Sequence, residues 1–121
     1  MSSTEHLEGI WQATSAVVNG EEMPADAVRT IQLILTATRF TTRRGGQTLF
    51  DSSYSVNAAK VPNEIEMIGI EDFAGKPALG IYALDGEVLQ LCYRMPGFLR
   101  PTASESADGS GAFLITLKRS P

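Results

Sequence analysis

Polar and apolar residues alternate along most of this chain, and turn-forming residues interrupt the alternation about every ten residues. A period of two places successive side chains on opposite faces of a strand, whereas a helix needs apolar residues three and four positions apart. Leu89, Leu91 and Tyr93 alternate in this way with Gln90 and Cys92. The pattern therefore predicts an all-β fold.

The alternating stretches predict eight strands, at residues 9–18, 30–36, 39–43, 48–56, 64–71, 78–84, 87–94 and 112–119. Asp85-Gly86 is a strong signal for a two-residue hairpin. The phase of the fifth strand changes around Gly69, which suggests a bulge. The sixth strand can face inward with either Leu79/Ile81 or Gly80/Tyr82/Leu84. The one helical candidate is a short turn near residues 24–29, since Pro24 suits a first helical position.

Eight short antiparallel strands in sequential order fit an up-and-down β-barrel, because closure of the sheet removes its exposed edges. A β-sandwich is the main alternative. We expect a single domain over residues 9–121, preceded by an N-terminal tail, residues 1–8, because 121 residues fit one core. The interior of an eight-stranded barrel is filled by side chains or holds one small ligand.

The lengths of the connections predict a wide end and a narrow end of this barrel. The long connections 19–29 and 95–111 fall at one end, which we call the mouth, and the tight turns 37–38 and 85–86 fall at the other, which we call the base. The side chains expected inside the first strand become smaller toward the mouth: Trp11, Ala13, Ser15 and Val17. Trp11 would therefore plug the base and leave space above it.

Closure of the barrel predicts a contact between the two ends of the chain. The last strand must pair with the first in antiparallel fashion, which brings Arg119 beside Trp11. A guanidinium group can pack there on the indole face. Gly9 would leave space for the chain to cross beneath Trp11. We expect Gly9, Trp11 and Arg119 to form the structural base of the barrel.

Gly9-Ile10-Trp11 near the start of the chain, with the basic Arg119 ending the last strand, resembles the lipocalin and calycin pattern. From Leu7 to Arg119 the chain is similar to a family of small lipocalin-like domains first described from planctomycetes, in the pieces LEGIWQ, NGEEMP, GIYALDGEVLQLC, RPT and LITLKR. The resemblance implies a lipocalin-like β-barrel and a bacterial source. That family has no established activity, so the resemblance implies no catalytic residues.

Composition and charge disfavour several classes of partner. The formal net charge of −4 makes nucleic-acid binding improbable unless basic residues cluster. No apolar run approaches the roughly 18 residues of a membrane span. Residues 1–9 lack the features of a secretory signal, so we expect a cytoplasmic protein, or a mature form whose leader has been removed.

The chain offers few residues for catalysis. His6 is the single histidine and falls in the expected tail, so no serine or cysteine triad can form without it. Cys92 is expected to be a packed, inert thiol. Glu64 and Glu66 alternate on one strand face, as solvated surface charges do. We expect no catalytic constellation, no metal site and no cofactor, and hence no enzyme.

Two functions therefore stay open. The first is a module that binds an apolar or amphipathic small molecule inside the barrel. The binding candidates are Tyr54, Leu91, Tyr93, Arg94 and Arg100, with an arginine at the mouth holding an acidic head group and tyrosine hydroxyls orienting it. The mouth carries charges of both signs, so no strong steering field is expected. The second is a protein-interaction domain with a filled core and no ligand.

Overall fold

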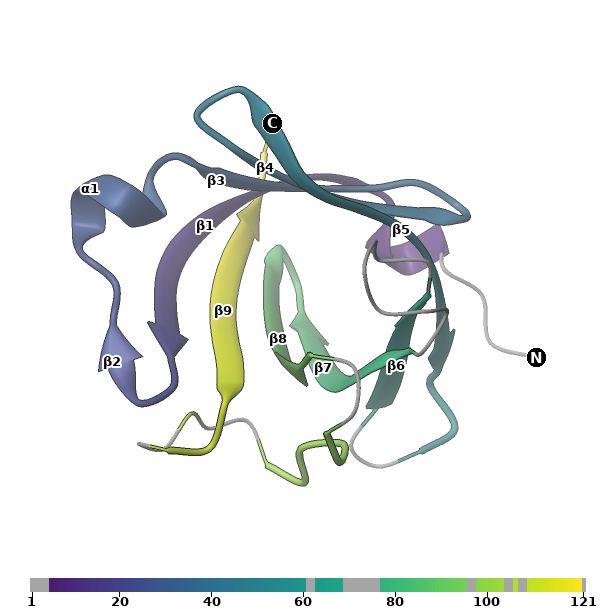
Figure 1. Ribbon diagram of the computed structural model, residues 1–121. Coiled ribbons are helices and arrows are strands. Elements are labelled where there is room, and N and C mark those ends of the chain that lie inside the picture. Colours follow the sequence, from purple (N-terminus) through teal and green to yellow (C-terminus); the bar gives the residue numbers. More distant parts are fainter. Residues whose placement is uncertain are drawn as a thin grey trace.

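The chain forms a closed antiparallel β-barrel (Figure 1). The computed structural model describes residues 5–60, 63–68, 77–95, 98–103, 106 and 109–120, without the side chains of Glu5 and Phe50. Its strands are β1 (Gly9–Val18), β2 (Glu21–Glu22), β3 (Ile31–Leu35), β4 (Arg39–Arg44), β5 (Gln47–Asn57), β6 (Asn63–Ile68), β7 (Ala78–Asp85), β8 (Val88–Arg94) and β9 (Ala112–Arg119). A 3-10 helix η1 (Glu5–Leu7) and a short α1 (Ala25–Val28) complete the described elements.

Each long strand pairs with the next one along the chain, and β9 pairs back to β1. This closure of eight strands confirms the expected up-and-down barrel and excludes the sandwich. The boundaries lie close to those expected, and the predicted helical turn is α1. The two-residue β2, which the sequence did not indicate, pairs with Val17 and Val18 at the end of β1.

The interior face of β1 differs from the expectation in its second half. Trp11 and Ala13 are buried as expected, but Ser15 is exposed and Ala16 is buried in its place. The pairing of β1 with β9 shifts between Ala13 and Ser15. Such a bulge adds one residue to one strand, so every later side chain changes face. The expected inward positions of Ser15 and Val17 are therefore wrong.

The facing of β7, left open by its sequence, is settled by burial. Ala78, Tyr82 and Leu84 pack into the interior cluster of apolar residues. Ile81 instead belongs to a second small cluster, with Cys92. On β6, Ile65 and Met67 face the interior as expected, whereas the predicted bulge at Gly69 lies outside the described residues.

The second cluster lies on the outer wall of the barrel. It consists of Ile81, Cys92 and Ala112, with Leu114 packed against it. The segment 98–103 follows this wall, because the Cys92 thiol lies 3.6 Å from the carbonyl oxygen of Ala103. We expected the whole 95–111 connection at the mouth. That expectation is wrong for residues 98–103, because they fold back over an apolar outer surface that the barrel would otherwise expose to water.

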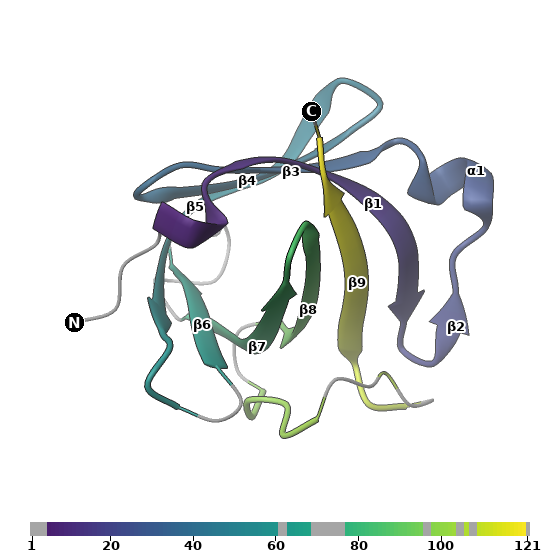
Figure 2. The same cartoon turned by 180° about the vertical axis from the view of Figure 1, so that it is seen from behind.

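Part of the segment expected to be an N-terminal tail is folded. Residues Glu5–Leu7 form η1, and Leu7 is buried with a relative exposure of 1%. In both views of the ribbon, η1 lies beside the turn between β3 and β4 (Figure 1, Figure 2). Leu7 thus adds an apolar side chain to the closed end. Among the described residues, no helix has the length and apolar character needed to cross a membrane.

Candidate functional site

The base of the barrel is closed by a stack of Arg119 on Trp11. The indole is fully buried, and the guanidinium carbon lies 4.2 Å from the ring centroid. Arg119 is the register partner of Trp11 between β9 and β1, as the closure of the barrel required. Because the indole is buried but the Arg119 side chain is 28% exposed, this cation–π contact is worth about 1 kcal/mol.

Arg119 also holds the N-terminal segment in place. Its Nη1 donates to the carbonyl oxygen of Glu8 at 2.6 Å, and its Nη2 donates to that of His6 at 3.1 Å. Its Nε lies 3.1 Å from a carboxylate oxygen of Glu87. The indole Nε1 of Trp11 donates to the carbonyl oxygen of Leu7 at 2.9 Å. The two chain ends are thereby locked together across the base.

Gly9 has a different role from the expected one. Its φ of +140° is one that glycine adopts readily and other residues rarely do. A Cβ atom built at Gly9 would lie 2.8 Å from Nη1 of Arg119. The space left by the missing side chain is therefore occupied by the guanidinium group that covers Trp11.

His6, the only histidine, belongs to the base. Its Nε2 lies 3.1 Å from the hydroxyl oxygen of Tyr82, and the two rings are 6.0 Å apart. Burial raises the pKa of Tyr82 above its usual value. The contact ties η1 to β7 and gives the buried tyrosine hydroxyl a partner.

Along the interior face of β9, exposure of the side chains increases from the base toward the mouth. Near the base, Trp11, Leu35 and Leu117 are almost completely buried. Farther up β9, Ile115 and Phe113 are only partly buried, although both pack against the interior cluster. Met23 and Met95, next to the strands at the mouth, are also partly buried and contact the same cluster. Solvent thus reaches an apolar surface in the upper part of the barrel.

The interior contains three tyrosines, and two of their hydroxyls have protein partners. The hydroxyl of Tyr54 donates to the carbonyl oxygen of Thr36 at 2.7 Å, and that of Tyr82 contacts His6. The hydroxyl of Tyr93 has no hydrogen-bond partner among the described residues. Its ring stacks on Phe113, with centroids 5.1 Å apart and planes inclined by 15°. Burial raises the pKa of Tyr93 to about 12.

Gly80 lies directly opposite Tyr93 in the pairing of β7 with β8. A Cβ atom at this position would lie 2.6 Å from the Cβ of Tyr93 and 2.7 Å from the carbonyl oxygen of Cys92. Only glycine permits this approach. The sequence carries a signal for this approach, because an isolated glycine inside a strand often marks a close backbone contact.

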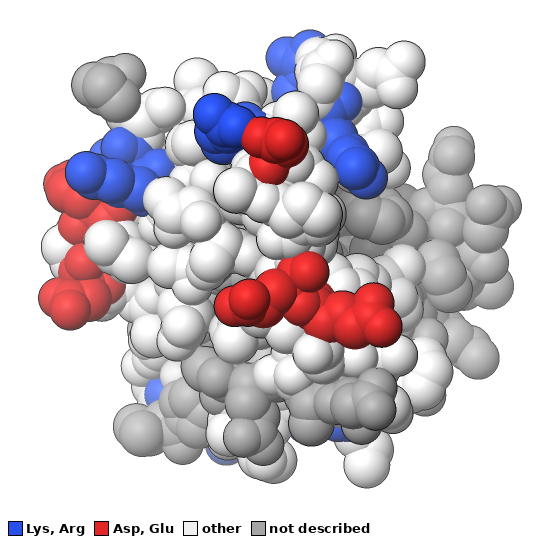
Figure 3. All heavy atoms as spheres, turned by 90° about the vertical axis from the view of Figure 1, so that its left-hand side faces the viewer, with Lys and Arg blue, Asp and Glu red and all other residues white. Residues whose placement is uncertain are grey.

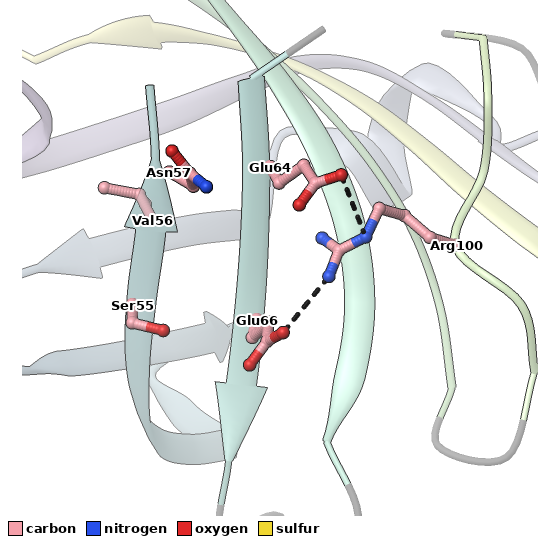
Figure 4. A pocket seen from close by; sticks show the side chains of 6 residues that line it. All are labelled: Ser55, Val56, Asn57, Glu64, Glu66 and Arg100. Atoms are coloured by element: carbon pink, nitrogen blue, oxygen red, sulfur yellow. Dashed lines mark hydrogen bonds and ion pairs between the residues drawn. The ribbon is translucent and has the colours of Figure 1, made fainter. Parts of the chain in front are cut away.

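Arg100, expected to hold an acidic head group, is instead bound to the outer wall (Figure 4). Its Nη1 donates to the carbonyl oxygens of Ile65 at 3.1 Å and Gly80 at 2.9 Å. Its Nη2 lies 3.1 Å from Glu66 and its Nε 3.7 Å from Glu64. These contacts fasten the segment 98–103, which we call the strap, across β6 and β7.

Arg94, the other arginine expected to bind a ligand, also faces the outside. It alternates on β8 with the inward-facing Leu91 and Tyr93, and its Nη1 donates to the carbonyl oxygen of Leu99 at 3.3 Å. Both arginines therefore hold the connection after β8. Of the five predicted binding residues, Leu91 and Tyr93 share the interior wall toward the mouth, while Tyr54 makes its hydrogen bond to Thr36.

A small polar pocket lies beside Arg100 on the outer wall (Figure 4). Its volume is 150 Å³, and it is lined by Ser55, Val56, Asn57, Glu64, Glu66 and Arg100. Pockets that enclose drug-sized ligands have volumes of about 300–1,000 Å³. This pocket is too small for such a molecule, and its two carboxylates are occupied by Arg100.

We next consider metal-binding groups and charged patches among the described residues. Within them, no group of three or more His, Cys, Asp or Glu side chains is placed to hold a metal ion. The side of the molecule that carries β2 and α1 shows small separate groups of acidic and basic side chains, with neither sign dominating (Figure 3). Arg29 and Asp26 of this region form an ion pair.

Comparisons of the chain with protein-family models, with curated proteins and with solved structures gave no match. The barrel topology thus stands on the structure alone, and the lipocalin-like relationship stays a prediction.

Proposed function

We propose that this protein binds one small apolar molecule inside the barrel, between the Trp11 plug and the mouth. The observation that carries the proposal is the increase of exposure along the interior face of β9, from Leu117 to Phe113. Trp11 is completely buried, whereas Ile115 and Phe113, on the same interior surface, are partly exposed to solvent. An apolar surface that is enclosed by a barrel and still reached by water gains free energy when a ligand covers it.

The wall that such a ligand would contact is built from β8 and β9. Leu91 pairs with Ile115 and Tyr93 pairs with Phe113 across these two strands, which gives a continuous apolar and aromatic surface. The polar contact expected from Arg94 or Arg100 is not part of this proposal, because both side chains point to the outer wall.

The test is a titration with Nile red, an uncharged dye whose fluorescence increases in apolar surroundings. Saturable one-to-one binding by the wild-type protein is expected. Ile115→Phe should reduce the affinity about 10-fold or more, because it adds volume to the proposed binding space. Thr116→Phe is the matched control, since the next residue of β9 points to the outside and should leave the affinity unchanged. Circular dichroism verifies that both variants fold.

Absence of saturable binding by the wild-type protein would refute the proposal. Equal loss of affinity in the two variants would place the dye outside the barrel. Native mass spectrometry of protein purified from its source is a second test, because a retained small molecule adds a defined mass.

A second candidate function is an interaction with another protein through the strap. Phe98 and Leu99 are 57% and 82% exposed, which is unusual for adjacent large apolar side chains. This function would be favoured if Nile red does not bind and a defined partner binds the wild-type protein but not the Phe98→Ser/Leu99→Ser variant.

A further inference from the structure

The interior wall carries no charge among the described residues. Every member of the buried interior cluster is an apolar residue or a tyrosine. The charged side chains nearest to this face lie at its two ends. Arg119 is engaged at the base, and Arg44, which pairs with Ile31 at the end of β4, is exposed. The guanidinium groups of Arg94 and Arg100 form their hydrogen bonds on the outer wall.

This distribution of charge restricts the ligand. An ionised group that leaves water for an apolar environment loses several kcal/mol of solvation unless an opposite charge and hydrogen bonds replace it. No buried residue described on the interior wall supplies such a charge. A carboxylate or phosphate in the barrel would therefore lose more solvation free energy than its contacts with the interior wall replace. An uncharged molecule does not have this cost.

Tyr93 supplies a polar contact in this uncharged surrounding. Its side chain is 5% exposed, and its hydroxyl has no hydrogen-bond partner within the described part of the chain. The hydroxyl is not among the completely buried polar atoms that lack a partner in the described residues, so solvent reaches it, and a ligand oxygen that pairs with it takes the place of water. The ring stacks on Phe113, and a Cβ atom built at Gly80 would lie 2.6 Å from the Cβ of Tyr93, so the side chain is closely packed before binding.

We propose that the ligand is an uncharged, largely apolar molecule with a hydroxyl or carbonyl oxygen that forms a hydrogen bond with the hydroxyl of Tyr93. This inference rests on the proposed function, since it assumes that the barrel interior binds a small molecule. It adds the chemical class of that molecule and the residue that recognises its polar group.

The inference is tested by displacement of Nile red with three molecules of equal chain length: 1-dodecanol, dodecane and dodecanoate at pH 8. We expect 1-dodecanol to displace the dye at the lowest concentration and dodecanoate to need at least 10-fold more. Tyr93→Phe should weaken 1-dodecanol about 10-fold and leave dodecane unchanged, because it removes only the hydroxyl group.

Tyr54→Phe is the matched control. It also removes one hydroxyl from an interior tyrosine, but that hydroxyl is already bonded to Thr36. Tyr54→Phe should therefore lower the free energy of unfolding without changing the preference for the alcohol over the alkane.

The outcomes separate this inference from the proposed function. Failure of Nile red to bind refutes the proposed function itself. Dye binding with dodecanoate as the strongest competitor overturns the inference. Loss of that preference for dodecanoate in Arg44→Ala would then place its carboxylate at the mouth, beside Arg44. Equal effects of Tyr93→Phe on 1-dodecanol and dodecane also overturn it, since the hydroxyl then makes no specific contact.

Discussion

Replacement of Trp11 by alanine is the most direct test of the closed base. Truncation of a fully buried tryptophan typically costs about 3–5 kcal/mol, because the lost burial is accompanied by a cavity. Two further interactions disappear with the indole: the stack of Arg119 at 4.2 Å and the hydrogen bond to the carbonyl oxygen of Leu7. We therefore expect the upper part of the range, about 4–5 kcal/mol. Domains of this size have total stabilities of about 5–15 kcal/mol, so Trp11→Ala should be marginally folded.

The assay is urea unfolding followed by far-ultraviolet circular dichroism, since Trp11 is the only tryptophan and its fluorescence is lost on mutation. Trp11→Phe serves as the companion variant. It keeps an aromatic face for Arg119 but removes the N–H donor and part of the volume, which should cost about 1–2 kcal/mol.

A cost below about 2 kcal/mol for Trp11→Ala would refute the role of Trp11 as the plug, because so small a value is typical of a side chain that the site can lose without a cavity. Loss of Nile red binding in a stable Trp11→Phe protein would refute the assignment of base and mouth.

Three further predictions address the wall around β7 and β8. Gly80→Ala should lower the free energy of unfolding by about 2–3 kcal/mol in urea, because the new methyl group meets backbone and Cβ atoms at 2.6–2.7 Å; a cost under 0.5 kcal/mol would contradict this. Arg100→Ala should loosen the strap and increase the rate at which Cys92 reacts with an aromatic disulfide reagent, and an unchanged rate in a folded protein would show that other contacts hold the strap. Burial raises the pKa of Tyr93 from 10.0 to about 12, so its contribution to stability is complete below pH 10 and is lost as the pH rises from 10 toward 12. The stability difference between the wild type and Tyr93→Phe should change over that interval and stay constant between pH 7 and 9.

The sequence was sufficient to predict the barrel because two independent signals agreed. Alternation identified strands, and turn residues such as Asp85-Gly86 divided them into eight pieces with short connections. Closure of the barrel brings the last strand beside the first, and an even number of strands makes this pair antiparallel, so the contact between Arg119 and Trp11 could be predicted.

The bulge in β1 could not be predicted from hydrophobicity. Thr14, Ser15 and Ala16 are all small, so a shift of one residue changes neither the volume nor the polarity of the inward face by much. The position of the bulge is determined by pairing with β9, which lies about a hundred residues away along the chain. Local patterns carry no information about such a partner.

The ambiguous facing of β7 was itself a sign of the strap. Apolar residues occur on both faces of this strand because Tyr82 is buried in the interior, while Ile81 is buried on the outer face with Cys92, whose thiol contacts Ala103 of the strap. Continuous apolar character is typical of strands covered on two sides. The contacts of Arg100 depend on the same feature. Arg100 reaches the carbonyl oxygens of Ile65 and Gly80 only because the strap lies on β6 and β7.

Gly80 links the inner and outer surfaces of this wall. Its missing side chain permits the close approach of Tyr93 on the inside, and its carbonyl oxygen accepts a hydrogen bond from Arg100 on the outside. Gly80→Ala should therefore alter the interior and the strap together, whereas Arg100→Ala removes contacts on the outside alone. If Arg100→Ala frees Cys92 but leaves the affinity for 1-dodecanol unchanged, the two surfaces are independent. If it also weakens the alcohol, the strap holds Gly80 and Tyr93 in the positions that binding requires.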